Sequence, residues 1–155
     1  TMTRVYHALC IGAVKKNLRI DAPIGRHPTD RKKMAVLTTP GARARSAVTY
    51  VEIIQRLGNY TLIKARLETG RTHQIRVHMA HVGHPVLGDS VYGSQKNSFK
   101  SDGQILHAKF LKFVHPSFNE EMEFDSELPE YFMNAIESVR QRNFCNPETR
   151  TIEIK

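Results

Sequence analysis

Hydrophobic and polar residues alternate along several stretches of the chain, a pattern typical of β-strands with one buried face. The stretches that predict strands are residues 3–14, 18–23, 34–39, 47–57, 60–67, 105–115 and 121–124. Only Gly58-Asn59 separates the fourth from the fifth, so we expect these two to form an antiparallel hairpin. In the last two strands we expect the inward-facing side chains to be Leu106, Phe110, Phe113, Met122 and Phe124.

Residues 72–83 have the spacing of an amphipathic helix instead. Ile75, Met79 and Val82 recur at intervals of four and three residues and form one apolar stripe. We expect Thr72 to cap the start, because its hydroxyl can accept a hydrogen bond from a free backbone N–H. Gly83 suits the left-handed position that ends many helices.

A second helix is expected to begin at Pro129, which favours the first helical turn, with Phe132, Ile136 and Val139 on one face. The order of elements predicts an α+β fold with a mixed, mainly antiparallel sheet and flanking helices. Residues 144–155 depart from the pattern, and we leave open whether they form a tail, an extra edge strand or sequence introduced by cloning.

Charge adds information about the partner. The 155 residues fit one domain, and 23 Lys and Arg against 15 Asp and Glu give a formal net charge of +8. A basic balance favours a polyanionic partner, although a solvated basic surface is the plain alternative. Six of the cations lie in two loops, residues 25–33 and 40–46, where RNA phosphates could bind.

No apolar run is long enough to span a bilayer, and no signal peptide is present. The two cysteines, Cys10 and Cys145, lie far apart and form no disulfide or metal-binding pattern. These features predict a cytoplasmic protein that makes no use of a membrane.

The start of the first helix is rich in donors: Arg71, His73, Gln74, Arg76 and His78 surround it. Free N–H groups and a partial positive charge also favour an anion there. We expect the anion bound there to be a phosphate or a carboxylate from elsewhere in the fold.

The stretch ETGRTHQIRVHMAHVGHPVLGDSVYG, residues 68–93, resembles the signature of the RluA-type pseudouridine synthases. Leu106-His107-Ala108, residues 4–8 and residues 24–28 match the same family, in the same order. The resemblance runs from about Arg4 to the region of Arg140, and it implies that residues 1–143 are the C-terminal part of this family's catalytic domain, followed by a tail.

The resemblance implies isomerisation of uridine to pseudouridine in ribosomal or transfer RNA, without a cofactor. The family's essential aspartate lies in a His-Arg-Leu-Asp motif upstream of the strand that holds Tyr6, and this sequence lacks that motif. Two partners of that aspartate are matched: Arg76, which pairs with the carboxylate, and Tyr6, which stacks on the target base. We therefore expect this chain to be inactive by itself.

The remaining residues assigned to RNA or substrate binding are Arg26, Arg31, Lys32, Arg43, Arg71, His73, Gln74, Leu106 and His107. Gly88 and Asp89 are expected to close the loop after the first helix, with Tyr92 packed beneath it. His73 is expected to make hydrogen bonds at the helix start.

Two other functions stay open at this point. Without the aspartate, the chain could be a non-catalytic RNA-binding module. His73, His78, His81 and His84 invite a metalloprotein interpretation, but no carboxylate or cysteine completes a ligand set. A truncated sheet would also expose an unpaired edge, so we expect dimerisation, strand exchange or a poorly ordered N-terminus in isolation. A well-behaved monomer in sedimentation would contradict this.

Overall fold

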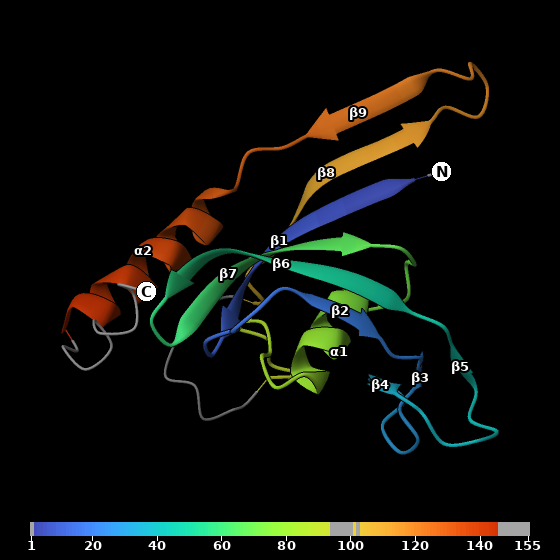
Figure 1. Ribbon diagram of the computed structural model, residues 1–155, viewed down its shortest axis with the longest axis horizontal. Helices are drawn as coiled ribbons and strands as arrows, with labels where there is room; N and C mark the ends of the chain where they lie inside the picture. Colours follow the sequence, from blue (N-terminus) through green and yellow to red (C-terminus); the bar gives the residue numbers. More distant parts are fainter. Residues whose placement is uncertain (1, 94–100, 102, 146–155) are drawn as a thin grey trace.

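The computed structural model describes residues 2–93, 101 and 103–145, which form an α+β fold around a six-stranded sheet (Figure 1). The strand order is β2-β6-β7-β1-β8-β9, and neighbouring strands are antiparallel throughout. The strands are β1 (Thr3–Ile11), β2 (Leu18–Asp21), β6 (Val48–Leu57), β7 (Tyr60–Leu67), β8 (Leu106–Val114) and β9 (Glu121–Asp125). The predicted fold class is confirmed.

Side chains alternate across the sheet and supply two separate cores. On β1, Ala8 and Cys10 belong to one cluster, whereas Leu9 belongs to the other. The predicted hairpin of β6 and β7 is confirmed: Leu57 pairs with Tyr60, and Gly58 takes the positive φ of 64° that this tight turn requires. β1 lies between β7 and β8, at the middle of the sheet.

One helix packs on each of these cores. Helix α1 (Gln74–His81) sets Ile75 and Met79 against the cluster that contains Ala8 and Cys10. Helix α2 (Glu130–Cys145) packs against Leu9 on the opposite face, through Phe132, Ile136 and Val139 as predicted. Helix α2 continues to Cys145, and the boundary between domain and tail stays a prediction.

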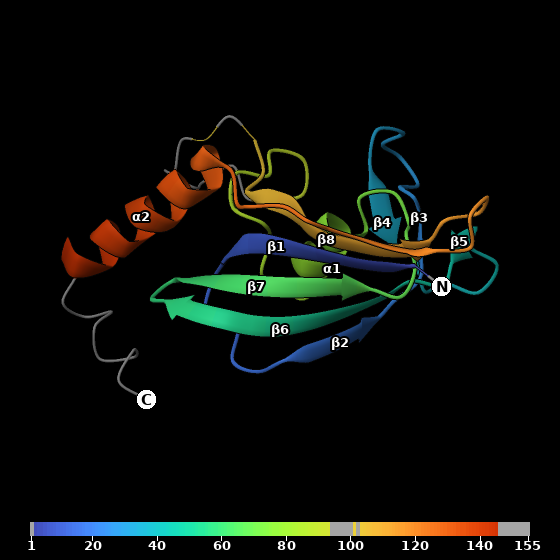
Figure 2. The ribbon, with the colours of Figure 1, turned by 90° about the horizontal axis from the view of Figure 1, so that it is seen from above.

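A three-stranded sheet lies beyond the end of the main sheet that is opposite α2 (Figure 2). Its order is β4-β3-β5, with β3 (Ile24–Arg26) in the middle, β4 (Met34–Val36) and β5 (Ala44–Arg45). We expected residues 25–33 to be a loop beside a hairpin, but Gly25 and Arg26 belong to the central strand. The strand predicted over residues 34–39 is found as β4, whereas β3 and β5, of three and two residues, are too short to show a period and were missed.

The start of α1 contradicts the predicted cap. The residue in the capping position is His73 rather than Thr72, and it has a left-handed backbone with φ 55° and makes no side-chain capping bond. The predicted end is confirmed, because Gly83 has φ 86°. Its N–H donates to Ala80 and the N–H of His84 donates to Met79, which is the Schellman arrangement.

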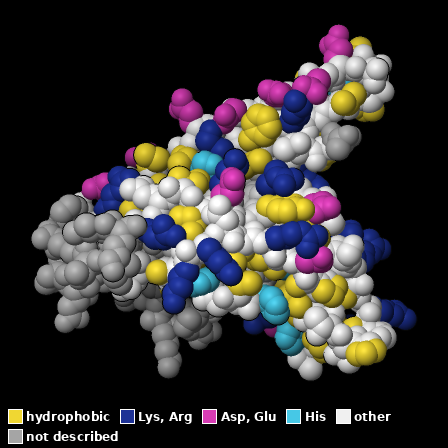
Figure 3. Space-filling model, viewed as in Figure 1, with side chains coloured by type: hydrophobic (Ala, Val, Ile, Leu, Met, Phe, Trp, Pro, Cys, Tyr) yellow, Lys and Arg dark blue, Asp and Glu magenta, His cyan; other side chains and the backbone are white. Residues whose placement is uncertain are grey.

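The outer strands β8 and β9 form an arm that extends from the sheet, lined by acidic side chains (Figure 3). The expectation that Phe124 faces inward is wrong: it is 51% exposed and stacks on Phe113 at 6.0 Å between ring centroids. Leu106, Phe110, Phe113 and Met122 are half-buried rather than core residues. The acids of β9, which is an outermost strand, would repel a second copy of that edge, and dimerisation stays a prediction.

A buried polar network joins α1 to β6. The Thr49 hydroxyl lies 2.8 Å from His78 Nδ1, and Gln74 Nε2 donates to Thr49 Oγ1 at 3.0 Å. His78 Nε2 lies 2.9 Å from the carbonyl oxygen of Ala22, so the ring bridges α1 to the segment after β2. Burial lowers the pKa of His78, which keeps the ring neutral.

Most of the polar loop predicted over residues 94–103, and most of the segment predicted over residues 144–155, lie outside the described residues. Neither helix in the described part of the chain has the length and apolar character needed to cross a membrane.

We predict that Thr49→Val, which keeps the side-chain shape, lowers the free energy of unfolding by about 1–3 kcal/mol. The loss arises because His78 Nδ1 and Gln74 Nε2 each lose a buried partner. Urea denaturation measures the change, with exposed Thr39→Val as the matched control. Equal effects of the two substitutions would contradict a stabilising role for the network.

Candidate functional site

Arg76 of α1 and Asp89, which follows that helix, form a bidentate ion pair. Arg76 Nε lies 2.7 Å from Asp89 Oδ2, and Nη2 lies 2.9 Å from Oδ1. The side chains of Arg76 and Asp89 are 11% and 0% exposed. Water therefore screens the pair little, and its two parallel hydrogen bonds fix the direction of the guanidinium.

Asp89 also organises the turn that follows α1. Its Oδ1 accepts hydrogen bonds from the backbone N–H groups of Val91 and Tyr92, each at 3.0 Å. Burial alone would raise the pKa of Asp89, but the hydrogen bonds and the charge of Arg76 outweigh it and lower that pKa. Asp89 is thus an anion that closes the loop, as expected for Gly88-Asp89.

Tyr92 packs beneath this loop and meets the helix start. Its ring lies under Arg76, with 5.1 Å from the guanidinium carbon to the ring centroid. Its hydroxyl lies 2.8 Å from His73 Nδ1 and accepts a hydrogen bond from the N–H of Met34 at 2.9 Å. The expectation that His73 makes hydrogen bonds at the helix start is confirmed.

Tyr6 lies on β1 between Ala65 of β7 and Ala108 of β8. It is half-buried and packs against the core cluster that contains Ile75, on the face of the sheet that α1 covers. Among the described residues, no hydrogen bond or ring contact joins Tyr6 to Arg76. Tyr6 therefore lies on the side of the sheet that α1, the helix of Arg76, covers.

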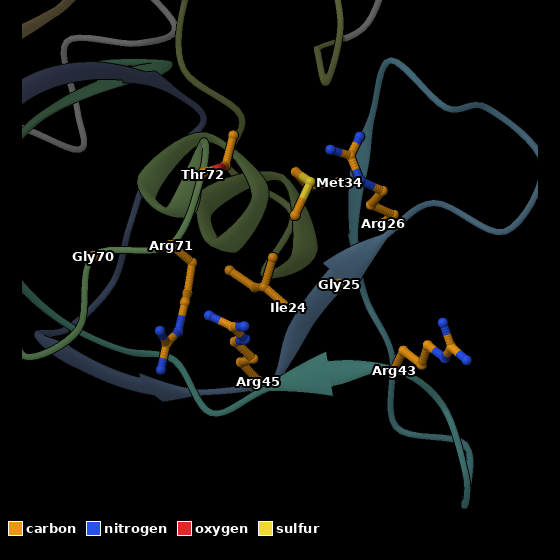
Figure 4. Close-up of a pocket in the computed structure, with 9 residues that line it drawn as sticks. All are labelled: Ile24, Gly25, Arg26, Met34, Arg43, Arg45, Gly70, Arg71 and Thr72. Carbon is orange, nitrogen blue, oxygen red and sulfur yellow. The ribbon is translucent and has the colours of Figure 1, made fainter.

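A pocket of about 400 Å³ lies between the small sheet and the loop that leads into α1 (Figure 4). It is lined by Ile24, Gly25, Arg26, Met34, Arg43, Arg45, Gly70, Arg71 and Thr72. Four of the nine are arginines, and none is acidic. Three of these arginines are among the assigned RNA-binding residues. The fourth, Arg45, was counted among the loop cations but was not assigned to the site.

The arginines of the pocket have no carboxylate partner among the described residues. Arg71 Nε donates to the carbonyl oxygen of Ser46 at 2.9 Å, which holds its stem in place. Arg26 makes a long contact of 3.4 Å to the carbonyl oxygen of Arg31. Figure 4 shows Arg45 and Arg71 extending on the same side of β3, while Arg43 points away from them. Unpaired guanidinium groups of this kind bind phosphates.

Gly25, one of the two glycines that line the pocket, permits the close approach of β5 to β3. A Cβ atom on Gly25 would overlap the carbonyl oxygen of Arg43 and lie 2.9 Å from a methyl carbon of Leu37. The absence of a side chain at Gly25 therefore brings Arg43 and Arg45 alongside Arg26.

The other predicted site residues lie apart from the pocket. Arg31 and Lys32 are exposed in the loop between β3 and β4. Leu106 and His107 lie on β8, where His107 Nε2 is 2.6 Å from the Ser126 hydroxyl. Gln74 is buried, and its amide bonds Thr69, Arg71, Val48 and Thr49, so its contacts indicate a structural role.

Within the part of the chain that the structure describes, no group of three or more His, Cys, Asp or Glu side chains could hold a metal ion. The metalloprotein interpretation gains no support from this arrangement.

The chain is similar to known proteins over most of its length. A family model described as RNA pseudouridylate synthase matches residues 1–81. Ribosomal large subunit pseudouridine synthase D of Pasteurella multocida is 41% identical over 151 residues, which cover 90% of this chain and 45% of that protein. The uncharacterized RNA pseudouridine synthase YlyB of Bacillus subtilis is 44% identical over 142 residues, covering 91% and 45%.

A solved structure shares the fold. Human RNA pseudouridylate synthase domain containing 1 aligns with a TM-score of 0.74 and 27% identity, covering 89% of this chain and 58% of that one. The chain spans less than half the length of the two curated relatives named above.

We predict that Asp89→Asn lowers the free energy of unfolding by about 3–5 kcal/mol, because it leaves Arg76 as an uncompensated, largely buried charge. Urea denaturation measures the loss. The control is Asp125→Asn, which removes the exposed partner of Lys109 and should cost less than about 1 kcal/mol. A similar loss for both variants would show that the Arg76–Asp89 pair stabilises the fold no more than an exposed ion pair does.

Proposed function

Because the chain belongs to the RNA pseudouridylate synthase family, we propose that the protein containing it isomerises uridine to pseudouridine in RNA. The reaction breaks the bond between N1 of the base and C1′ of the ribose, turns the base and joins C5 to C1′. The observation that carries the proposal is a pocket of four unpaired arginines at the start of α1, the helix that holds Arg76.

Arg76 keeps one donor group for a further acceptor. Its Nε and Nη2 bond Asp89, whereas Nη1 makes no hydrogen bond among the described residues. We assign Nη1 to the catalytic carboxylate of the family, whose motif is absent from this sequence. In this arrangement Asp89 holds the guanidinium still while Arg76 keeps the second carboxylate ionised and oriented.

Tyr6 supplies the aromatic surface for the target base. Its half-buried ring lies at the middle of the main sheet, and no hydrogen bond among the described residues occupies its hydroxyl. A phenol can stack on a base and also accept or donate a proton during the isomerisation.

The RNA backbone is bound by the arginine pocket. Arg26, Arg43, Arg45 and Arg71 contact phosphates there, and exposed Arg31 and Lys32 extend the same basic region. His73 lies beside this region. Leu106, which packs against the same cluster as Tyr6, approaches the base from β8, whereas the neighbouring His107 points to the other face of that strand. The names of several relatives make ribosomal RNA the first substrate to test. Transfer RNA, which the family resemblance also implies, is the second. A cytoplasmic site of action remains our prediction.

A non-catalytic RNA-binding module is the second candidate. The arginine pocket favours it, because phosphate binding there needs neither Tyr6 nor a catalytic carboxylate. The two candidates agree on binding and differ only in whether the bound RNA is modified.

We predict that Arg43→Gln with Arg45→Gln weakens binding of a uridine-containing RNA stem-loop and flattens its salt dependence. Each lost phosphate contact should lower the slope of log affinity against log salt by about 0.7–0.9. Fluorescence anisotropy at several salt concentrations measures the slope. Lys15→Gln with Lys16→Gln is the control, because it removes the same charge from exposed positions in the β1–β2 turn. Equal effects would show that only net charge matters.

We predict that the protein translated from the complete coding sequence releases tritium from RNA labelled at C5 of uridine, because the new bond to C1′ displaces that hydrogen. Tyr6→Phe should slow the release by about 10²–10⁴-fold. The 155-residue chain alone should release none. Release by this chain alone would refute the role given to the absent carboxylate, and salt-dependent binding without release by the complete protein would support the binding module.

A further inference from the structure

Tyr92 lies where three parts of the site meet. Its hydroxyl accepts a hydrogen bond from the N–H of Met34, a residue of β4 in the small sheet. The same hydroxyl lies 2.8 Å from His73 Nδ1, at the start of α1. Its backbone N–H donates to Asp89, and its ring lies under Arg76. One side chain thus touches the sheet that bears the pocket arginines and the residues that hold Arg76.

The hydrogen bonds of this hydroxyl have a defined direction. The oxygen accepts from the Met34 N–H, so its own proton is free to donate to His73 Nδ1. His73 must then be neutral with its proton on Nε2. Burial and the nearby charge of Arg76 lower the pKa of His73, which favours this form, although Asp89 acts in the opposite direction.

The backbone of His73 is held in a strained conformation for this contact. A φ of 55° is uncommon for a residue other than glycine and costs free energy that neighbouring contacts must offset. The ring makes no capping bond to the helix and instead meets the Tyr92 ring edge-on, with 5.6 Å between centroids. The strain therefore serves the contact with Tyr92 rather than the start of α1.

The small sheet also has apolar attachments on this side, where Val36 packs against the main core cluster that contains Ile75. Met34 and Val36 pack with Tyr92 around Ile24 and Val77, a cluster much smaller than either main core. The Met34–Tyr92–His73 chain is the polar link between β4 and the start of α1 among the described residues. A shift of the small sheet would consequently act on Tyr92 and, through the ring contact, on Arg76.

We propose that Tyr92, supported by His73, is a positioning residue that couples the arginine-bearing small sheet to Arg76. RNA phosphates seated in the pocket hold the small sheet in place, and Tyr92 passes that constraint to the guanidinium. This inference rests on the proposed function for its effect on the reaction, whereas its structural part concerns only the link between β4 and α1.

The first test is amide hydrogen exchange of the 155-residue chain with Tyr92→Phe, which keeps the ring and removes the hydroxyl. We expect the Met34 amide to exchange about 10-fold faster, because its hydrogen bond is lost. Tyr131→Phe is the matched control: it removes a tyrosine hydroxyl that bonds the carbonyl oxygen of Leu106 at 3.1 Å, far from the pocket. An unchanged Met34 amide in Tyr92→Phe would overturn the link.

The second test uses tritium release by the complete protein at saturating labelled RNA. In the native background, Arg45→Gln should lower kcat as well as raise KM, because a less firmly seated sheet leaves Arg76 less well oriented. In the Tyr92→Phe background, kcat should already be low and Arg45→Gln should raise KM alone. Multiplicative effects of the two substitutions on kcat would overturn the coupling, because a merely structural Tyr92 predicts that result.

His73→Asn provides a second variant should Tyr92→Phe fold poorly, because asparagine tolerates the left-handed backbone while removing the ring. It should reproduce the loss of coupling with no loss of stability. If the unmodified complete protein releases no tritium, the proposed function fails. The coupling is then tested by amide hydrogen exchange with the RNA stem-loop bound. It predicts that the RNA slows exchange of the Arg76 amide in the native chain but not in Tyr92→Phe. The same protection in both would overturn it.

Discussion

Enclosure of helix α1 is the constraint from which the rest of the site follows. Five of its eight residues are buried, including Gln74 and His78. Polar groups removed from water need partners inside the protein, so Thr49 and the carbonyl oxygen of Ala22 take up positions around the helix. The same requirement brings Asp89 to Arg76. The side of the sheet that α1 covers is therefore held by buried polar contacts as well as by apolar packing.

Arg76 and the pocket arginines differ in burial and in whether a carboxylate neutralises them. Arg76 is desolvated and is neutralised by a carboxylate, which makes it a fixed feature of the fold. The pocket arginines remain in contact with solvent and lack acidic neighbours among the described residues. Acidic side chains gather instead on the β8–β9 arm (Figure 3). This separation leaves a positive surface beside the helix start and directs a polyanion toward it.

Periodicity was enough to predict the long elements. The β6–β7 hairpin, helix α2 and the glycine end of α1 follow from local patterns that tertiary contacts reinforce. The start of α1 could not be predicted in this way, because the left-handed His73 depends on a contact with Tyr92, nineteen positions along the chain. Asp89 was expected only to close a loop, since nothing local indicates that it reaches back to Arg76. Alternation predicts Phe124 as a core residue, yet in the arm it contacts Phe113 and remains about half exposed.

The missing side chain at Gly25 has a consequence for how variation can act on this protein. Because the chain at the start of β5 lies directly over that position, even one methyl group there would force β3 and β5 apart. Both large cores lie elsewhere and would remain intact. A mutation at this glycine would thus displace the arginines of the pocket from one another while sparing most of the packed interior.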